Sequence, residues 1–273
     1  MINSVKMYVG WVDLEMFVEG RGTLFFFMIF FFAVYYAIAM LAKQGRKWDL
    51  RRLPQLDAIV EGIGRAVELG RPVHFSAGVA QGGPGDPDRL HAYPMLRYIA
   101  RECAQRDCRL ITTVGRSEVY AVLDQIVKEA AITAGKPEWY RAEDVRYLGD
   151  DQFVYVGGVM GLLQREKVAT NLLFGYWRGA LINALEAGRL SGCLQIGGIG
   201  RFSGELGIMA LGCDYWLVLE ELIAASAFLS EDPEQIGTIA AQDYIKYVII
   251  AISIIGALVF TAGIESLYKI LIW

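Results

Sequence analysis

The chain has 273 residues, 55% of them hydrophobic, and a formal net charge of −4 at neutral pH. It is too apolar for an ordinary soluble protein and too polar for a bundle of membrane helices. Residues 53–245 carry 17 Lys/Arg against 25 Asp/Glu, so nucleic acid is not an expected partner, because an acidic surface repels phosphate backbones.

Two apolar runs bracket the chain. A short, mildly amphipathic leader, residues 1–23, is predicted to lie along the outer membrane interface. Residues 24–42 carry no charge and are long enough to cross roughly 30 Å of hydrocarbon as a helix. The uncharged run Tyr247–Ile264 predicts a second membrane helix over residues 246–264, followed by a short tail, residues 265–273.

The charges beside the first run predict the orientation of the chain. Basic side chains close to a span stay on the cytoplasmic side. Five of them follow the first run, against one acid: Lys43, Arg46, Lys47, Arg51 and Arg52. The sequence therefore predicts an inner-membrane protein whose large domain is cytoplasmic and whose termini are both outside. The three acids that precede the first run argue against a cleaved signal peptide.

Residues 43–245 alternate between short apolar runs and helical patterns. The predicted strands are Val73–Val79, Leu110–Val114, Asp144–Leu148, Thr170–Phe174, Cys193–Gly197 and Tyr215–Glu220. The predicted helices are Pro54–Gly70, Leu90–Arg106, Ser117–Ala134, Gln152–Glu166, Tyr176–Ala187, Ser203–Leu211 and Leu222–Leu229, and another runs from Glu234 into the second span. Such alternation indicates an α/β, Rossmann-like, doubly wound and mainly parallel six-stranded sheet.

Cysteine and histidine give little sign of a metal site. The four cysteines form no C-x-x-C pair, which suits buried thiols in a reducing compartment. His74 lies early in a strand, at the end away from the expected ligand site, and is predicted to be structural. His91 falls in a Gly/Pro/Asp-rich stretch, residues 82–93, that is predicted to be an irregular loop. No metal ligand is assigned, and the sequence leaves the cofactor open.

The loop Gly197–Gly204 is the first candidate ligand site. In an open α/β sheet, ligands bind at the carboxyl ends of the strands. Glycines there expose backbone amides, and an arginine adds positive charge for an anion or nucleotide. The candidate residues are Gly197, Gly198, Gly200, Arg201 and Ser203, with Ser203 expected to cap the next helix. The alternative is an ordinary strand-to-helix turn, which needs glycine and a Ser/Thr cap whatever it binds.

Other strand ends carry further polar candidates. Ser76 lies toward the carboxyl end of the first predicted strand. Thr112 and Thr113 lie toward the end of the second and Arg116 follows it, so hydroxyls and a guanidinium could hold a phosphate or carboxylate there. The alternative for these residues is a strand end followed by a helix cap at Ser117.

Two pairs of acids complete the set. Asp150 with Asp151, and Glu220 with Glu221, could bind a divalent cation or act as acid and base. Asp151 is equally suited to cap the helix that follows it. One of the two glutamates is expected to point toward the interior or toward a subunit boundary, where it would need a partner such as Arg201 or Arg116.

Several stretches resemble one family of uncharacterised membrane-anchored proteins of bacteria and archaea, a domain of unknown function. The stretches are Leu53–Phe75, Asp150–Tyr155, Gln164–Lys167, Cys213–Tyr215 and Glu220–Ala227. The resemblance implies a cytoplasmic α/β domain between membrane segments. It brings no catalytic residue and no substrate.

Three functions remain open from the sequence. The first is a homo-oligomeric scaffold that organises a membrane complex with cytoplasmic protein partners, favoured by small residues in the second span. The second is a nucleotide- or anion-binding sensor at the membrane. The third is a metal-assisted hydrolase that uses the acidic pairs. No nucleophile motif occurs, so no catalytic residue is assigned and an enzyme is the weaker expectation.

Overall fold

The computed structural model describes residues 6–9, 12–15, 22–44, 53–79, 83–230 and 233–261. The chain divides into two compact units. One comprises Met1–Asp49 with Asp232–Trp273, and the other is Leu50–Glu231.

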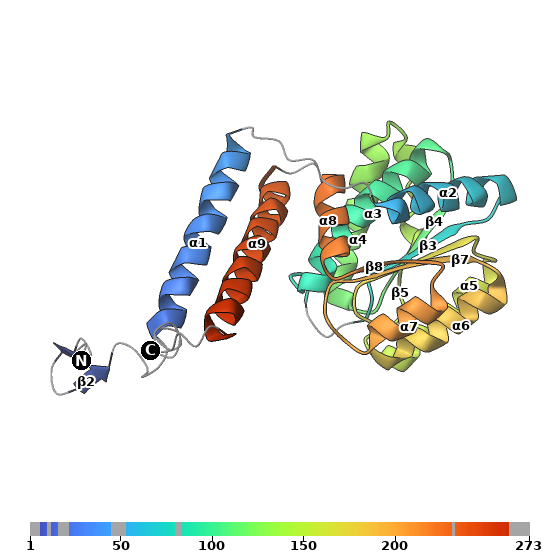
Figure 1. Cartoon of the computed structure of the whole chain (residues 1–273). Helices are drawn as coiled ribbons and strands as arrows, with labels where there is room; N and C mark the ends of the chain where they lie inside the picture. The colour runs from blue at the N-terminus through green and yellow to red at the C-terminus, as the bar shows by residue number, and fades with distance from the viewer. Residues whose placement is uncertain are drawn as a thin grey trace. The chain divides into compact units, whose positions relative to one another are not determined.

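The larger unit is built on a six-stranded, all-parallel sheet in the order β5-β4-β3-β6-β7-β8 (Figure 1). Its strands are β3 (Val73–Ser76), β4 (Leu110–Val114), β5 (Val145–Tyr147), β6 (Thr170–Phe174), β7 (Leu194–Ile199) and β8 (Tyr215–Val218). Its α-helices are α2 (Pro54–Leu69), α3 (Pro87–Gln105), α4 (Ser117–Thr133), α5 (Gln152–Arg165), α6 (Leu181–Ser191), α7 (Glu205–Gly212) and α8 (Glu220–Ser230).

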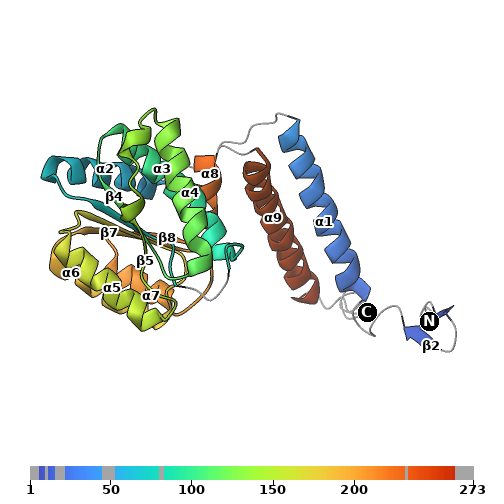
Figure 2. The same ribbon diagram turned by 180° about the vertical axis from the view of Figure 1, so that it is seen from behind.

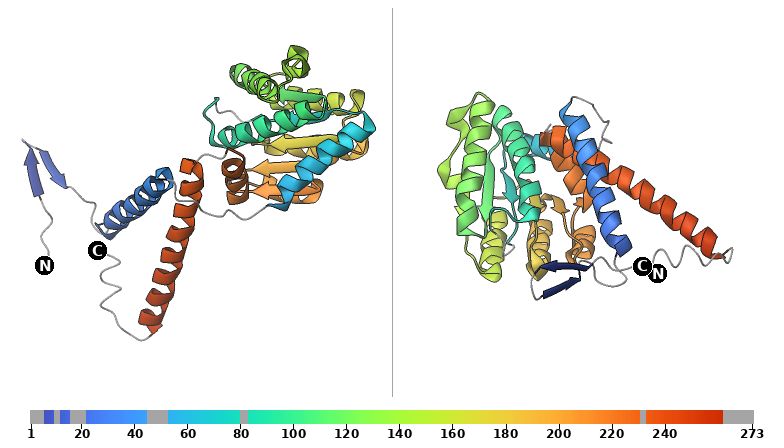
Figure 3. Two further views of the ribbon diagram at one scale, coloured as in Figure 1. Left: turned by 90° about the horizontal axis from the view of Figure 1, so that it is seen from above. Right: turned by 90° about the vertical axis from the view of Figure 1, so that its left-hand side faces the viewer.

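Helices cover both faces of this sheet (Figure 3). One core holds side chains of α2, α3, α4 and α8, and the other holds side chains of α5, α6 and α7. Every residue of β3, β4 and β6 is buried, as expected for central strands of a parallel sheet. The predicted α/β, Rossmann-like fold is thereby confirmed.

The strand order reverses between β3 and β6. From β3 the chain moves outward through β4 and β5, then returns to pair β6 with the other edge of β3 and continues through β7 to β8. Val73 therefore pairs with Leu110 on one side and with Thr170 on the other. This is the strand order of dinucleotide-binding doubly wound sheets, whose ligands lie at the carboxyl ends of the strands beside the reversal. We call this place the switch point.

Two predicted boundaries are wrong for local reasons. The expected loop over residues 82–93 ends early, because α3 already begins at Pro87, so His91 lies in a helix. Asp86 caps this helix, its carboxylate accepting from the Asp88 amide, and proline is favourable in a first turn. The predicted helix from Tyr176 instead begins at Leu181, after a 3-10 turn, Arg178–Ala180.

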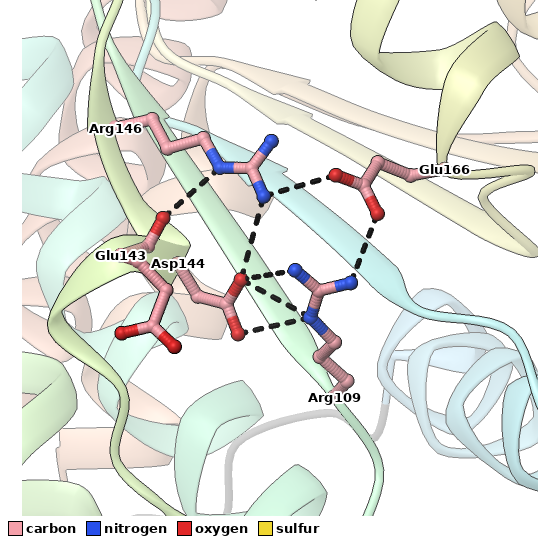
Figure 4. Close-up of polar contacts among 5 residues, drawn as sticks. All are labelled: Arg109, Glu143, Asp144, Arg146 and Glu166. Carbon is pink, nitrogen blue, oxygen red and sulfur yellow. Dashed lines mark hydrogen bonds and ion pairs between the residues drawn. The ribbon is translucent and has the colours of Figure 1, made fainter.

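An ion-pair network ties the amino-terminal side of the sheet together (Figure 4). Asp144, just before β5, lies 2.6 Å from Arg109 Nη2 and 3.5 Å from Arg146 Nη2. Glu166, after α5, lies 2.9 Å from Arg109 and 3.0 Å from Arg146. The hydrogen bonds that Arg109 donates to Asp144 raise the pKa of the Arg109 guanidinium. The network joins β4, β5 and α5 on the side away from the carboxyl ends, so we assign it a structural role.

The smaller unit contains two long helices, α1 (Gly22–Lys43) and α9 (Pro233–Thr261). Both are long and apolar enough to cross a membrane, over Phe25–Lys43 and Gln235–Leu258. The helices lie side by side (Figures 1 and 2). Tyr35 and Thr238 share a hydrogen bond of 3.1 Å, and a Cβ on Gly237 would lie 2.5 Å from that of Ala42.

Part of the predicted leader is described. Lys6–Val9 (β1) and Val12–Glu15 (β2) form an antiparallel pair, and the position of the leader along the membrane interface stays a prediction. Both strands contain β-branched or aromatic residues, which favour strands. The predicted tail and the last residues of the second apolar run lie outside the described residues.

Candidate functional site

The carboxyl ends of β3 and β6 meet backbone to backbone at the switch point. Gly78 and Gly175 both adopt positive φ, 76° and 90°. The Val79 amide donates to the Tyr176 carbonyl at 3.0 Å. A Cβ on Gly78 would lie 2.7 Å from the Tyr176 carbonyl oxygen, and one on Gly175 would lie 2.6 Å from that of Ala77. Glycine is therefore required at both positions.

Arg201 ties together three loops at this edge. It lies between β7 and α7, and its guanidinium is 3.3 Å from Asp86 and is also paired with Asp88 at the start of α3. The same guanidinium stacks 4.5 Å from the ring centroid of Tyr176, just after β6. Arg201 is thus already paired with two carboxylates, so an anion would have to compete with Asp86 and Asp88 for it, and its role as a ligand contact stays a prediction.

Buried acids lie beside this cluster. Asp88 is 2% exposed, and burial raises its pKa although Arg201 opposes the shift. Glu205, at the start of α7, is 4% exposed, and burial raises its pKa to about 7. Its Oε2 accepts from the Trp177 amide at 3.0 Å, while its Oε1 has no hydrogen-bond partner among the described residues. The site therefore holds a carboxyl group that is half protonated near neutral pH.

The raised pKa of Glu205 predicts how stability changes with pH. The folded chain holds this proton up to about pH 7, whereas an unfolded chain releases it near pH 4.5. Stability from Glu205 is thus complete below pH 4.5 and falls, by up to about 3 kcal/mol, as pH rises to 7. Glu205→Gln should flatten this part of the profile in denaturant unfolding of the full chain. An unchanged slope between pH 5 and 7 would contradict the assignment.

The predicted Gly197–Gly204 loop is shorter than expected. Gly197 and Gly198 belong to β7, not to a loop. A Cβ on Gly197 would lie 2.8 Å from Cys213 Sγ, and one on Gly198 would lie 2.7 Å from the Phe174 ring, so these two glycines serve sheet packing. Of the predicted glycines, Gly200 faces the site, since its Cβ would lie 3.3 Å from an Asp88 oxygen.

Two predicted helix caps are also wrong. The residue before α7 is Gly204, and the Ser203 hydroxyl has no partner among the described residues. Before α4 the cap position is Arg116, and the amide of Ser117 donates to Asp150 at 3.2 Å.

A buried chain of hydrogen bonds crosses the sheet and ends at the switch point. His74 and Asn171 are 2.7 Å apart, and Asn171 donates to Gln195 at 3.2 Å, so the asparagine oxygen must accept from His74 Nδ1. Both amide protons of Gln195 reach backbone carbonyls, those of Leu185 and Gly212. Burial lowers the pKa of His74 to about 4, so the ring is neutral. His74 is the structural histidine that the sequence predicts.

In the other half of this hydrogen-bond chain, from His74 to Ser76, the donors and acceptors are also fixed. His74 Nε2 must accept from the Thr113 hydroxyl, at 2.9 Å. Tyr155 then donates to Thr113 at 2.8 Å, and Ser76 donates to Tyr155 at 2.6 Å. The Gly78 amide donates to Ser76 at 3.0 Å. Thr113 and Ser76, two predicted ligand contacts, are thus members of an internal chain. Thr112 is buried elsewhere, and its hydroxyl has no partner among the described residues.

Asp150, Asp151 and Glu221 of the two acidic pairs form hydrogen bonds with residues outside the Arg201 cluster. Asp151 caps α5 by accepting from the amides of Phe153 and Val154, as one of the two interpretations expects. Glu220 and Glu221 begin α8, and Glu221 accepts from the Val218 amide at 3.4 Å. Neither glutamate is buried within the chain, so the interior position is not observed, and the alternative position at a subunit boundary stays a prediction. Among the described residues, no group of three or more His, Cys, Asp or Glu is arranged to hold a metal.

Sequence reasoning misses four members of this site: Asp86, Asp88, Tyr176 and Glu205. The Asp86-Pro87 pair, a helix cap followed by a first-turn proline, was an available signal for α3 and hence for both aspartates. Glu205 and Tyr176 follow neighbouring strands, but nothing local separates them from other loop residues.

Comparison with known proteins gives one family. A family model described as "Domain of unknown function (DUF6754)" matches residues 12–271. No curated protein and no solved structure matches the chain.

Proposed function

Because the chain belongs to the DUF6754 family, a domain of unknown function, we propose from its own geometry that the α/β unit binds a nucleotide at the switch point. The strand order carries this proposal. Sheets of this order bind their ligands beside the reversal, and here both strands at the reversal end in glycines that bring backbone close to backbone. With α1 and α9 as anchors, the protein would be a nucleotide sensor at a membrane.

The charges of the site indicate where the ribose and the phosphate of a nucleotide would lie. Asp86 and Asp88 outnumber the charge of Arg201, so the start of α3 suits hydroxyl donors such as those of ribose better than phosphate. Arg116 lies between β4, the second strand of the unit, and α4, and an arginine near this place in folds of this order accommodates a phosphate on the ribose. We therefore expect phosphate on the Arg116 side.

A thermal-shift panel tests the proposal on the full chain in mild detergent. Adenosine, AMP, ATP, NAD and NADP are compared with inorganic phosphate. At a hundredfold excess over its dissociation constant, a ligand stabilises the folded state by about 2.7 kcal/mol, a clear shift in melting temperature. Arg116→Ala should weaken the phosphorylated ligands at least tenfold and leave adenosine unchanged.

The matched control is Arg189→Ala. Arg189 lies in the last turn of α6 and pairs with Glu186 on the surface, so this variant should bind like the wild type. No shift with any nucleoside or nucleotide would overturn the proposal. An equal loss in both variants would remove Arg116 from the site.

A homo-oligomeric scaffold is the second candidate, favoured by exposed apolar side chains. Phe202 and Leu211 are 89% and 92% exposed, and the edge strand β8 exposes Tyr215 and Trp216. Exposed apolar groups of this size are suited to protein contacts. Native mass measurement that finds only monomer in mild detergent would contradict it.

Membrane insertion and a cytoplasmic domain are also proposals. The apolar helices and the basic residues after α1 support them. Protease digestion of sealed, inside-out vesicles should release the α/β unit.

A further inference from the structure

An ion pair lies on α9 within its apolar part. Asp243 and Lys246 are 3.4 Å apart, and their side chains are 58% and 43% exposed. Both residues fall inside Gln235–Leu258, the stretch of α9 long and apolar enough to span a membrane. Charged side chains in a span are costly when they face lipid, and they usually face protein or water instead.

The register of α1 and α9 gives the depth of this pair. Gly237 contacts Ala42, one residue before the end of α1 at Lys43. Asp243 lies six residues farther along α9 and Lys246 nine, or about 9 and 14 Å at the rise of an α-helix. Helix α1 is roughly 33 Å long by the same measure. If α1 spans the bilayer, the pair lies well inside the hydrocarbon.

The pair also faces away from α1. The side of α9 toward α1 is marked by Gly237, which meets Ala42, and by Tyr244, Val248 and Ala251, which share a groove with residues of α1. At 3.6 residues per turn, Lys246 lies about half a turn from this side and Asp243 about a third. Within the described residues, no other helix of this unit covers them.

We propose that this face of α9 binds the α9 of a second copy of the chain, with Asp243 of each copy paired to Lys246 of the other. The proposal rests on membrane anchoring but not on nucleotide binding. Two copies inserted in the same direction are related by an axis along the membrane normal, so their α9 helices run parallel. Asp243 and Lys246 are about one turn apart, which lets each acid reach across to the opposite lysine.

The chemistry of the face suits this occupant. Each copy carries one negative and one positive group, so two copies are complementary and the contact is net neutral. Apolar lipid chains offer these charged groups no such partners. Ser253 and Ala257 lie on the exposed side of the same helix, and small residues there allow close approach of a neighbouring helix.

Charge exchange tests the contact in the full-length protein. Native mass spectrometry and sedimentation in mild detergent measure the dimer–monomer equilibrium. Asp243→Lys and Lys246→Asp should each weaken the dimer at least tenfold, because like charges then face each other. The double variant D243K/K246D restores opposite charges and should return the equilibrium to within about twofold of the wild type.

Two controls separate the outcomes. Tyr244→Phe, on the side toward α1, should leave the equilibrium unchanged. Resistance of every variant to alkaline extraction from membranes tests anchoring by itself. A chain that resists extraction but stays monomeric overturns the dimer alone, whereas a chain that is extracted overturns anchoring and the proposal with it. Single variants that dimerise normally, or a double variant as weak as the singles, would also overturn the contact.

Discussion

Asn171→Leu should destabilise the protein by about 3 kcal/mol, one of the two largest single-residue effects expected. Asn171 is fully buried on β6 and joins two halves of the hydrogen-bond chain. Leucine has a similar volume but no polar atom. His74 would lose the acceptor of its Nδ1 proton, and Gln195 would lose its donor. Each buried group without a partner costs about 1–3 kcal/mol.

The measurement is thermal unfolding of the full chain, followed by tryptophan fluorescence of the α/β unit. A loss of 3 kcal/mol should lower the melting temperature by about 6–12 °C for a unit of this size. Gln125→Leu is the matched control, because Gln125 is an exposed amide on α4 that donates to Glu129 at 2.8 Å. A melting temperature equal to that of the control would show that the buried hydrogen-bond chain contributes little to the stability of the α/β unit.

Gly78→Ala should cost at least as much and should also abolish nucleotide binding. Gly78 combines a φ of 76° with a backbone neighbour at 2.7 Å from any added Cβ. Alanine would strain the backbone and push β3 away from Tyr176 at the switch point. We expect a loss of about 3 kcal/mol or more, since strain and steric overlap add.

Gly135→Ala separates those two causes. Gly135, after α4, has a nearly identical φ of 75°, but nothing lies within 4 Å of an added Cβ. It should cost about 1 kcal/mol, from backbone strain alone. Denaturant unfolding of both variants gives the difference. If the two losses are equal, close packing at the switch point is not a stabilising feature.

The sheet could be predicted because its strands are short apolar runs separated by helical patterns. Leu110–Val114 and Thr170–Phe174 are predicted to the residue, since both are buried on every side and end in glycine or charge. Strand ends that remain polar or contain glycine are harder. The predicted strand stops at Gly197, yet β7 continues through Gly198 to Ile199, and Cys213 and Phe174 occupy the space that side chains at the two glycines would need.

The candidate site could be predicted only in its general place. Carboxyl strand ends are the expected location in any α/β sheet, and Arg201 and Gly200 do lie there. Its partners could not be found, because Asp86 and Asp88 are 115 and 113 residues away in sequence and meet Arg201 only once β3 and β7 are placed by the fold. Thr113 and Ser76 are predicted as ligand contacts because they are hydroxyls near strand ends. Their hydrogen-bond partners, His74 on β3 and Tyr155 on α5, are brought to them only by the fold.

The direction of the buried hydrogen-bond chain limits what Ser76 can offer a ligand. Its hydroxyl proton is committed to Tyr155, and one lone pair already accepts from the Gly78 amide. What remains is a single acceptor. Ser76 is fully buried, so a ligand would reach this acceptor only by displacing the residues that cover it, and only with a group that brings its own proton, as a sugar hydroxyl or an amine does and a phosphate dianion does not. To donate instead, Ser76 would require Tyr155 and Thr113 to turn over together, which would leave His74 without its proton donor. A neutral histidine two residues back along the same strand thus fixes the direction in which every hydroxyl of this hydrogen-bond chain donates.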